Sequence, residues 1–96
     1  MKVVYTDEAL SDLDDIFRYI AEQYPGTLTR FQTRLRTAAA RISAWPSSAP
    51  RVHNYSELRM VNLAPYPYRL FYRVKEDRIE VLHVRHAARR LPWEDA

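Results

Sequence analysis

The residues of this chain best equipped for chemistry gather near its C-terminal end. The segment 68–90, YRLFYRVKEDRIEVLHVRHAARR, holds six arginines and two histidines. A guanidinium group binds carboxylate or phosphate through paired hydrogen bonds, and an imidazole titrates near neutral pH, where it can move a proton. These residue types indicate anion binding, with or without acid–base chemistry at His86.

Charge is distributed unevenly along the chain. Residues 1–45 carry six basic and six acidic side chains, whereas residues 46–93 carry nine basic and four acidic ones, a balance of +5. Thirteen of the fifteen basic residues are arginine. Such a segment favours an acidic partner or a nucleic acid, although a well-solvated arginine-rich surface gives the same pattern.

A β-hairpin is predicted to position these arginines. Residues 68–74 and 79–84 are rich in aromatic and β-branched side chains, and the polar break 75–78 between them has hairpin length. A two-residue turn at Glu76-Asp77 sets a register with three pairs, namely Tyr72 opposite Val81, Leu70 opposite His83, and Arg73 opposite Glu80. One extra bulged residue would exchange the faces.

Two amphipathic helices are predicted before the hairpin. The first begins at a Thr6 or Asp7 cap and ends at Pro25-Gly26, and the second runs from near Thr27 to Pro46. Their apolar residues recur at three- and four-residue steps, as Leu10, Leu13, Phe17, Ile20 and Tyr24 in the first and Leu28, Phe31, Leu35, Ala38, Ile42 and Trp45 in the second. So short a break folds the helices back on each other. The core is expected to contain Phe17, Phe31, Leu35 and Ile42, although the second stripe could instead dimerise as a coiled coil.

The remaining segments predict an α+β fold. Strands at 2–5 and 57–63 join the hairpin, and residues 46–56 read as a loop by composition. The predicted order is β-α-α-β-β-β, with the helix hairpin packed on one face of a small, mostly antiparallel four-stranded sheet. The other face stays open, a shape suited to binding something extended.

Composition also excludes several classes of protein. Ninety-six residues make one domain, spanning 1–96. Without cysteine there is no disulfide or thiolate zinc site, and His53 and His83 lack the spacing of metal ligands, so no metal or cofactor is expected. No apolar run approaches the roughly 20 residues of a membrane span, and the N-terminal segment lacks the apolar core of a signal peptide. We expect a cytoplasmic protein with no membrane association.

The chain as a whole resembles the RelE/ParE superfamily of toxins from type II toxin–antitoxin systems. The resemblance covers roughly residues 3–92 and rests on DIFRYIAEQYPG in the first helix, on AARRISAWP at the exit of the second, and above all on YRLFYRV followed by IEVLHVRHAARR. It implies a toxin held silent by a co-expressed antitoxin that wraps it, which makes a hetero-oligomer the expected form. The superfamily then divides by target.

Members similar to RelE cut messenger RNA on the ribosome. In that branch basic residues hold phosphate and stabilise negative charge as the ribose 2′-hydroxyl attacks. The resemblance places one such arginine at Arg69, but the positions where those nucleases have lysines fall on Met60 and Asn62, and the position after the last strand falls on Ala87. A weaker nuclease site could still be built from Arg69, Arg73, Arg85 and His86.

These departures favour the ParE-like branch, whose members resemble inhibitors of DNA gyrase that stop replication and serve plasmid stabilization. Under that interpretation no residue is catalytic, and His86 belongs to the strand exit. The predicted target- or nucleic-acid-binding residues are Arg59, Arg69, Arg73, Arg85, His86, Arg89, Arg90 and Trp93, because arginine and aromatic side chains dominate such contacts. A ribosome-dependent endoribonuclease remains the alternative, and a non-toxic nucleic-acid-binding module is a third.

Overall fold

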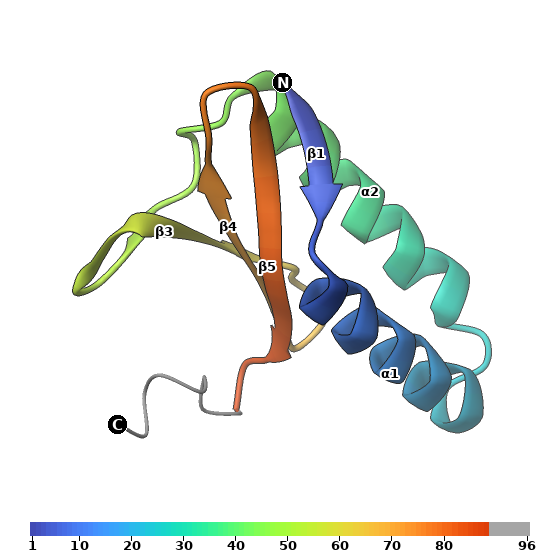
Figure 1. Ribbon diagram of the computed structural model, residues 1–96. Helices are drawn as coiled ribbons and strands as arrows, with labels where there is room; N and C mark the ends of the chain where they lie inside the picture. The colour runs from blue at the N-terminus through green and yellow to red at the C-terminus, as the bar shows by residue number, and fades with distance from the viewer. Residues whose placement is uncertain (89–96) are drawn as a thin grey trace.

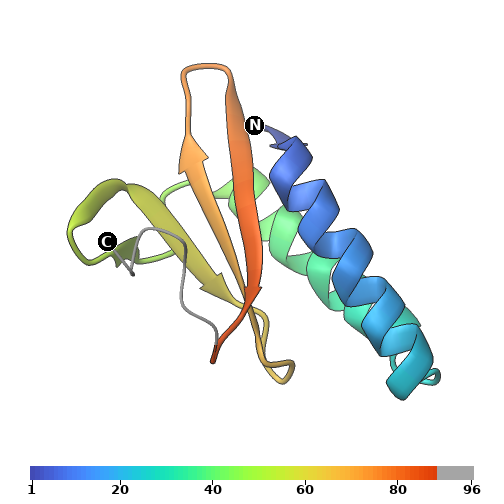
Figure 2. The same cartoon turned by 60° about the horizontal axis from the view of Figure 1, so that its bottom comes forward.

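The protein has two layers, a helix pair and a five-stranded sheet, in a computed structural model that describes residues 1–88. The elements follow one another as β1 (Lys2–Tyr5), α1 (Asp7–Gln23), α2 (Leu28–Ala44), β2 (Arg51–Val52), β3 (Tyr55–Asn62), β4 (Tyr68–Val74) and β5 (Arg78–His86). Their order in the sheet is β1-β5-β4-β3-β2. Both helices lie on one side of this sheet (Figures 1 and 2), which confirms the α+β fold and the helix hairpin.

Each helix lies close to its predicted bounds. The Thr6 hydroxyl caps α1 by accepting a hydrogen bond from the Ala9 N–H at 3.2 Å, and acidic residues in the first turn suit the positive end of the helix dipole. The predicted stripes are largely buried, with Leu13, Ile16 and Ile20 facing inward from α1 and Phe31, Leu35, Ala38 and Ile42 from α2. The ends of the stripes depart from prediction, because Leu10, Tyr24 and Trp45 are each more than half exposed.

The sheet has one strand more than predicted. β2 forms inside the stretch that composition assigned to a loop, and it pairs with β3 through Val52 and Tyr55. The two residues between them turn the chain, and Asn54 has a φ of 69°, a conformation that asparagine tolerates better than most side chains. The turn also starts β3 at Tyr55 rather than Glu57, whereas β4 has the predicted bounds and β5 runs on to His86.

A β-bulge sets the register of the central hairpin. The predicted pairs Tyr72 with Val81 and Arg73 with Glu80 are confirmed, but Leu70 lies opposite Val84 instead of His83. The register shifts after Phe71, which pairs with His83 and leaves Leu82 as the extra residue. The predicted partner of Leu70 was therefore wrong.

The core lies between the helices and the sheet. Phe31, Leu35 and Ile42 are buried in it, and Phe17 packs against it at its edge, as predicted. The Phe31 ring contacts Phe17 edge-on at a centroid distance of 6.1 Å and Tyr68 at 5.3 Å. Aromatic pairs of this geometry add to the stabilisation from apolar burial. Within residues 1–88 no helix is long and apolar enough to cross a membrane.

Candidate functional site

Two arginines lie opposite each other on the face of the sheet turned away from the helices. Arg69 on β4 alternates with Tyr68 and Leu70, which belong to the core, so its side chain leaves the opposite face. Arg69 pairs with Arg85 on β5 and with Asn62 on β3. The structure therefore brings together two of the predicted site residues, and we call Arg69 and Arg85 the arginine pair.

The arginine pair is electrostatically incomplete. Like charges directly opposite each other on neighbouring strands destabilise a sheet. The Nε atoms of both side chains are buried, and neither has a hydrogen-bond partner within the described part of the chain, although buried polar atoms almost always have one. Asp12 already lies 3.5 Å from Arg85, so a further carboxylate or phosphate group would chiefly offset the charge of Arg69. The pair is thus the best candidate for contact with an acidic protein surface or a nucleic-acid backbone.

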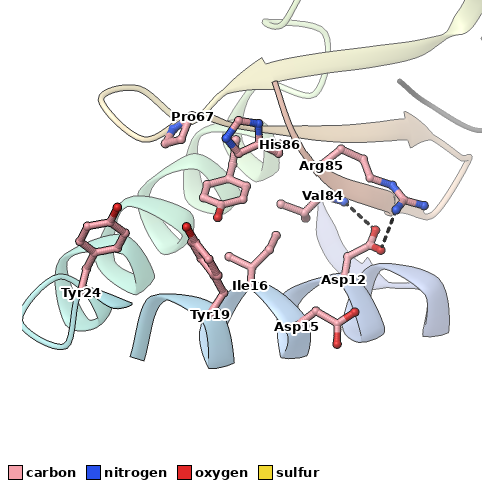
Figure 3. Close-up of a pocket in the computed structure, with 10 residues that line it drawn as sticks. Asp12, Asp15, Ile16, Tyr19, Tyr24, Pro67, Val84, Arg85 and His86 are labelled. Carbon is pink, nitrogen blue, oxygen red and sulfur yellow. Dashed lines mark hydrogen bonds and ion pairs between the residues drawn. The ribbon is translucent and has the colours of Figure 1, made fainter. Parts of the chain in front are cut away.

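One carboxylate on α1 holds Arg85 in place. Asp12 Oδ1 lies 3.5 Å from Arg85 Nη1, and Asp12 Oδ2 accepts a hydrogen bond from the backbone N–H of Val84 at 3.1 Å and lies 3.4 Å from His83 Nδ1. Figure 3 shows this carboxylate between α1 and the end of β5. β1 pairs with β5 only as far as Val81. Beyond that point the Asp12 carboxylate accepts the hydrogen bond from the Val84 N–H that a neighbouring strand would otherwise accept.

The sequence analysis did not single out Asp12. A signal was available in the helical spacing. Asp12 follows Ala9 by three residues and precedes Ile16 by four, and both of those side chains are buried. An acid at such a position lies on the flank of the buried stripe and can reach the sheet. Its side chain is only 13% exposed, against 72% for Asp14.

Two other predicted contact residues have partners inside the chain. Arg73 donates from Nε to Glu80 at 2.7 Å, and Arg78 binds the other oxygen of the same carboxylate at 3.0 Å. The hydrogen bond from Arg73, with a further one from Arg78, lowers the pKa of Glu80. Arg59 donates to the carbonyl oxygens of Ala49 at 2.6 Å and Ser47 at 3.2 Å and so ties β3 to the loop after α2.

His86 is engaged at the exit of β5. Its Nδ1 accepts a hydrogen bond from the backbone N–H of Ala88 at 3.1 Å, and its ring stands edge-on to Tyr68 at 5.5 Å. The imidazole thus contacts both the backbone that follows β5 and the ring of Tyr68. The predicted contacts Arg89, Arg90 and Trp93 lie outside the described residues.

The outer face of the sheet is less open than predicted. Leu58 on β3 is 8% exposed and Phe71 on β4 is 4% exposed, and they form a second cluster with the partly buried Val52, Met60 and Leu82. Large apolar side chains on the outer side of neighbouring strands pack against one another. The arginine pair therefore borders a largely buried apolar cluster.

A groove opens beside the arginine pair, between α1 and the ends of β4 and β5. Its volume is about 480 Å³, within the range of small ligand sites. Its walls are made by Asp12, Asp15, Ile16, Tyr19, Tyr24, Pro67, Tyr68, Val84, Arg85 and His86. Figure 3 shows Tyr19 and Tyr24 on one side of it and His86 on the other. No group of three or more histidine, aspartate or glutamate side chains within residues 1–88 is arranged to hold a metal ion.

Comparison with known proteins agrees with this architecture. The chain is 33% identical over 91 residues to the putative toxin Y4kP of Sinorhizobium fredii, covering 95% of this chain and 93% of the relative. It is 34% identical over 88 residues to toxin RelE2 of Caulobacter vibrioides, covering 92% and 97%. The fold is similar to that of the chromosomal ParDE toxin–antitoxin system from P. aeruginosa, with a TM-score of 0.77, 20% identity and coverage of 90% and 95%.

A family model spans almost the whole chain. It is described as the ParE toxin of the type II toxin–antitoxin system parDE, and it matches residues 3–91. That range includes β1, both helices, the central hairpin and the arginine pair. The chain therefore belongs to the ParE toxin family of type II toxin–antitoxin systems.

Proposed function

We propose that this toxin inhibits DNA gyrase, and that the arginine pair contacts the target. The observation that carries the proposal is the juxtaposition of two guanidinium groups, of which Arg85 is paired with Asp12 whereas Arg69 has no ion pair within residues 1–88. A protein surface that supplies a carboxylate would offset the charge of Arg69, and arginine is one of the residue types that most often dominate the binding energy of protein interfaces. The proposed toxin acts in the cytoplasm as a binding inhibitor.

The surroundings of Arg69 support inhibition over cleavage. A ribosome-dependent nuclease of this superfamily is expected to have lysines on the preceding strand, yet those positions hold Met60, in the apolar cluster, and Asn62, the neutral partner of Arg69. Arg85, opposite Arg69, is already paired with Asp12. Arg73 is neutralised by Glu80, and His86 holds the N–H of Ala88. A surface with this composition suits binding better than proton transfer.

The alternative function is cleavage of messenger RNA on the ribosome. The observation that favours it is again the arginine pair, because two adjacent guanidinium groups also fit a phosphate and can stabilise negative charge in a transition state. Under this alternative His86 moves a proton, and its substitution abolishes activity.

The partner that neutralises a type II toxin is its cognate antitoxin, and membership in the family implies one for this chain. We propose that the antitoxin is acidic and covers the arginine pair, since charge complementarity favours that surface. Expression of the toxin alone should stop growth, and co-expression of the protein encoded by the neighbouring reading frame should restore it. Normal growth of cells that make the soluble toxin alone would contradict this proposal.

Two assays with purified protein separate the targets. One measures supercoiling by gyrase, and the other follows message integrity by primer extension on translating ribosomes. Gyrase inhibition with intact message is the expected result, and the double variant Arg69→Ala, Arg85→Ala should lose it while His86→Ala keeps it. Message cut by the wild type but not by His86→Ala would overturn the proposal. Arg36→Ala, an exposed arginine on α2, serves as the control for loss of general positive charge.

A further inference from the structure

The groove between α1 and the strand ends is walled by three tyrosines. Tyr19 and Tyr24 stand edge to face with their ring centroids 6.3 Å apart, and each side chain is more than half exposed. Tyr68 closes the inner end, where burial, and then the nearby Tyr19 and Tyr24 phenols, raise its pKa. The structure records no hydrogen bond within residues 1–88 for any of the three hydroxyl groups. The rings and hydroxyl groups of Tyr19 and Tyr24 thus remain available to a partner (Figure 3).

The charges around the groove select a cation. Two carboxylates, Asp12 and Asp15, and one guanidinium, Arg85, line it, which leaves one net negative charge when His86 is neutral. Arg85 is offset by Asp12, whereas Asp15 is 74% exposed and shares the single guanidinium of Arg18, at 3.5 Å, with Asp14. The whole of α1 carries six acids and one arginine on a chain whose net charge is +3. The groove is therefore an acidic site on a basic protein.

Aromatic rings beside a carboxylate are a recognised environment for a positively charged side chain. The faces of phenol rings attract a cation that approaches within about 6 Å of the ring centroid, and an exposed carboxylate adds a hydrogen-bonded ion pair. An anion would instead meet Asp15 and the negative ring faces. The same groove therefore discriminates against the acidic groups that suit the arginine pair.

We propose that this groove receives an arginine or lysine side chain of the cognate antitoxin. The proposal rests on the toxin–antitoxin assignment and adds a second, oppositely charged contact to it. The partly exposed rings of Tyr19 and Tyr24 supply apolar surface that such a side chain and its neighbours would bury. Tyrosines in such a position are frequent centres of binding energy in protein interfaces.

The main experiment measures binding of the antitoxin from the neighbouring reading frame to the purified toxin by calorimetry. Tyr19→Ala should weaken binding by at least about tenfold, and Asp15→Asn by several fold. The controls are Asp14→Asn, which removes an equally exposed acid outside the groove, and Trp45→Ala, which removes an exposed aromatic ring at the end of α2. Both controls should bind the antitoxin like the wild type.

A second measurement uses a free probe and the wild-type protein alone. Nα-acetyl-arginine amide should shift the ring resonances of Tyr19 and Tyr24 in NMR spectra at millimolar concentration, and Nα-acetyl-glutamine amide should not. Unchanged tyrosine resonances with the arginine probe would contradict the proposal. This readout requires no variant to fold.

Failure of this proposal differs from failure of the toxin assignment. Antitoxin that binds Tyr19→Ala and Asp15→Asn with wild-type affinity, and still neutralises the toxin, would overturn the groove proposal alone. Absence of toxicity when the wild type is expressed by itself would overturn the proposed function first. If ultracentrifugation instead finds a toxin dimer that Tyr19→Ala dissociates, the groove belongs to a contact between two copies and the proposal is wrong.

Discussion

Replacement of Asp12 by alanine should destabilise the protein far more than its place on a surface helix suggests. The substitution removes the acceptor from the Val84 N–H, a hydrogen bond of 3.1 Å at a residue that is 1% exposed. Hydrogen bonds to charged groups contribute about 1.5–3 kcal/mol. The ion pair with Arg85, at 3.5 Å and mostly buried, adds a smaller amount. We expect a loss of about 2–3 kcal/mol from the free energy of unfolding.

Two matched variants separate the causes of that loss. Asp12→Asn keeps an oxygen that can accept from the Val84 N–H but removes the charge, so it should cost roughly 1 kcal/mol. Asp14→Ala removes an exposed acid whose ion pair with Arg18 contributes about 0.3–0.5 kcal/mol. Both alanine variants gain the same helix propensity, so the difference between them reports the contact with β5.

Thermal unfolding followed by circular dichroism provides the assay. For a domain of this size 1 kcal/mol shifts the melting temperature by about 4–8 °C, so Asp12→Ala should melt roughly 10–20 °C below the wild type. The melting temperature of Asp12→Asn should lie between those of Asp12→Ala and the wild type, and that of Asp14→Ala should stay within a few degrees of the wild type. Equal melting temperatures for Asp12→Ala and Asp14→Ala would show that the carboxylate does not cap β5.

Three further predictions concern the core and the ion pairs. Leu35→Ala should cost about 2–5 kcal/mol as a large-to-small change at a buried site, and a melting temperature within error of the wild type would place that stripe outside the core. The lowered pKa of Glu80 makes its contribution to stability complete above its ordinary pKa of 4.5 and lost as the pH falls through the lowered value. Unfolding measured between about pH 6 and pH 3 should therefore lose less stability in Glu80→Gln than in the wild type, and parallel profiles would refute the role of that pair. Arg59→Ala should cost roughly 1–2 kcal/mol, because it leaves the Ala49 carbonyl without its donor, and faster proteolysis of the loop after α2 should accompany the loss.

Periodicity and turn chemistry made most of the fold predictable. The buried positions of both helices recur at helical spacing, and the polar segment between β4 and β5 is too short for anything but a hairpin. The N–H of Lys75 does bond the carbonyl of Arg78 at 2.8 Å across that turn. These signals are local, so a single sequence reports them.

The features that were missed depend on contacts between distant segments. β2 has two residues, too few for a periodic pattern, and it exists because β3 offers its edge. Asp12 reaches a backbone group 72 positions away along the chain, and its helical spacing marked it as a flanking residue without naming that partner. The sequence likewise shows that Arg59 and Arg73 are charged, but it does not show which groups of the chain they bind.

The bulge at Leu82 decides on which face the arginine pair forms. Without the bulge, the register that pairs Tyr72 with Val81 would continue along the hairpin. Arg85 would then lie opposite Tyr68, on the side of the sheet that faces the core. With one extra residue, Val84 enters the core and Arg85 comes opposite Arg69. Burying the charged Arg85 side chain would cost the free energy of its desolvation, whereas burying Val84 does not, and this difference favours the bulged register. The packing of the core thus supplies the free energy that holds Arg69 and Arg85 opposite each other. Binding of an anionic partner would relieve part of the repulsion between their charges.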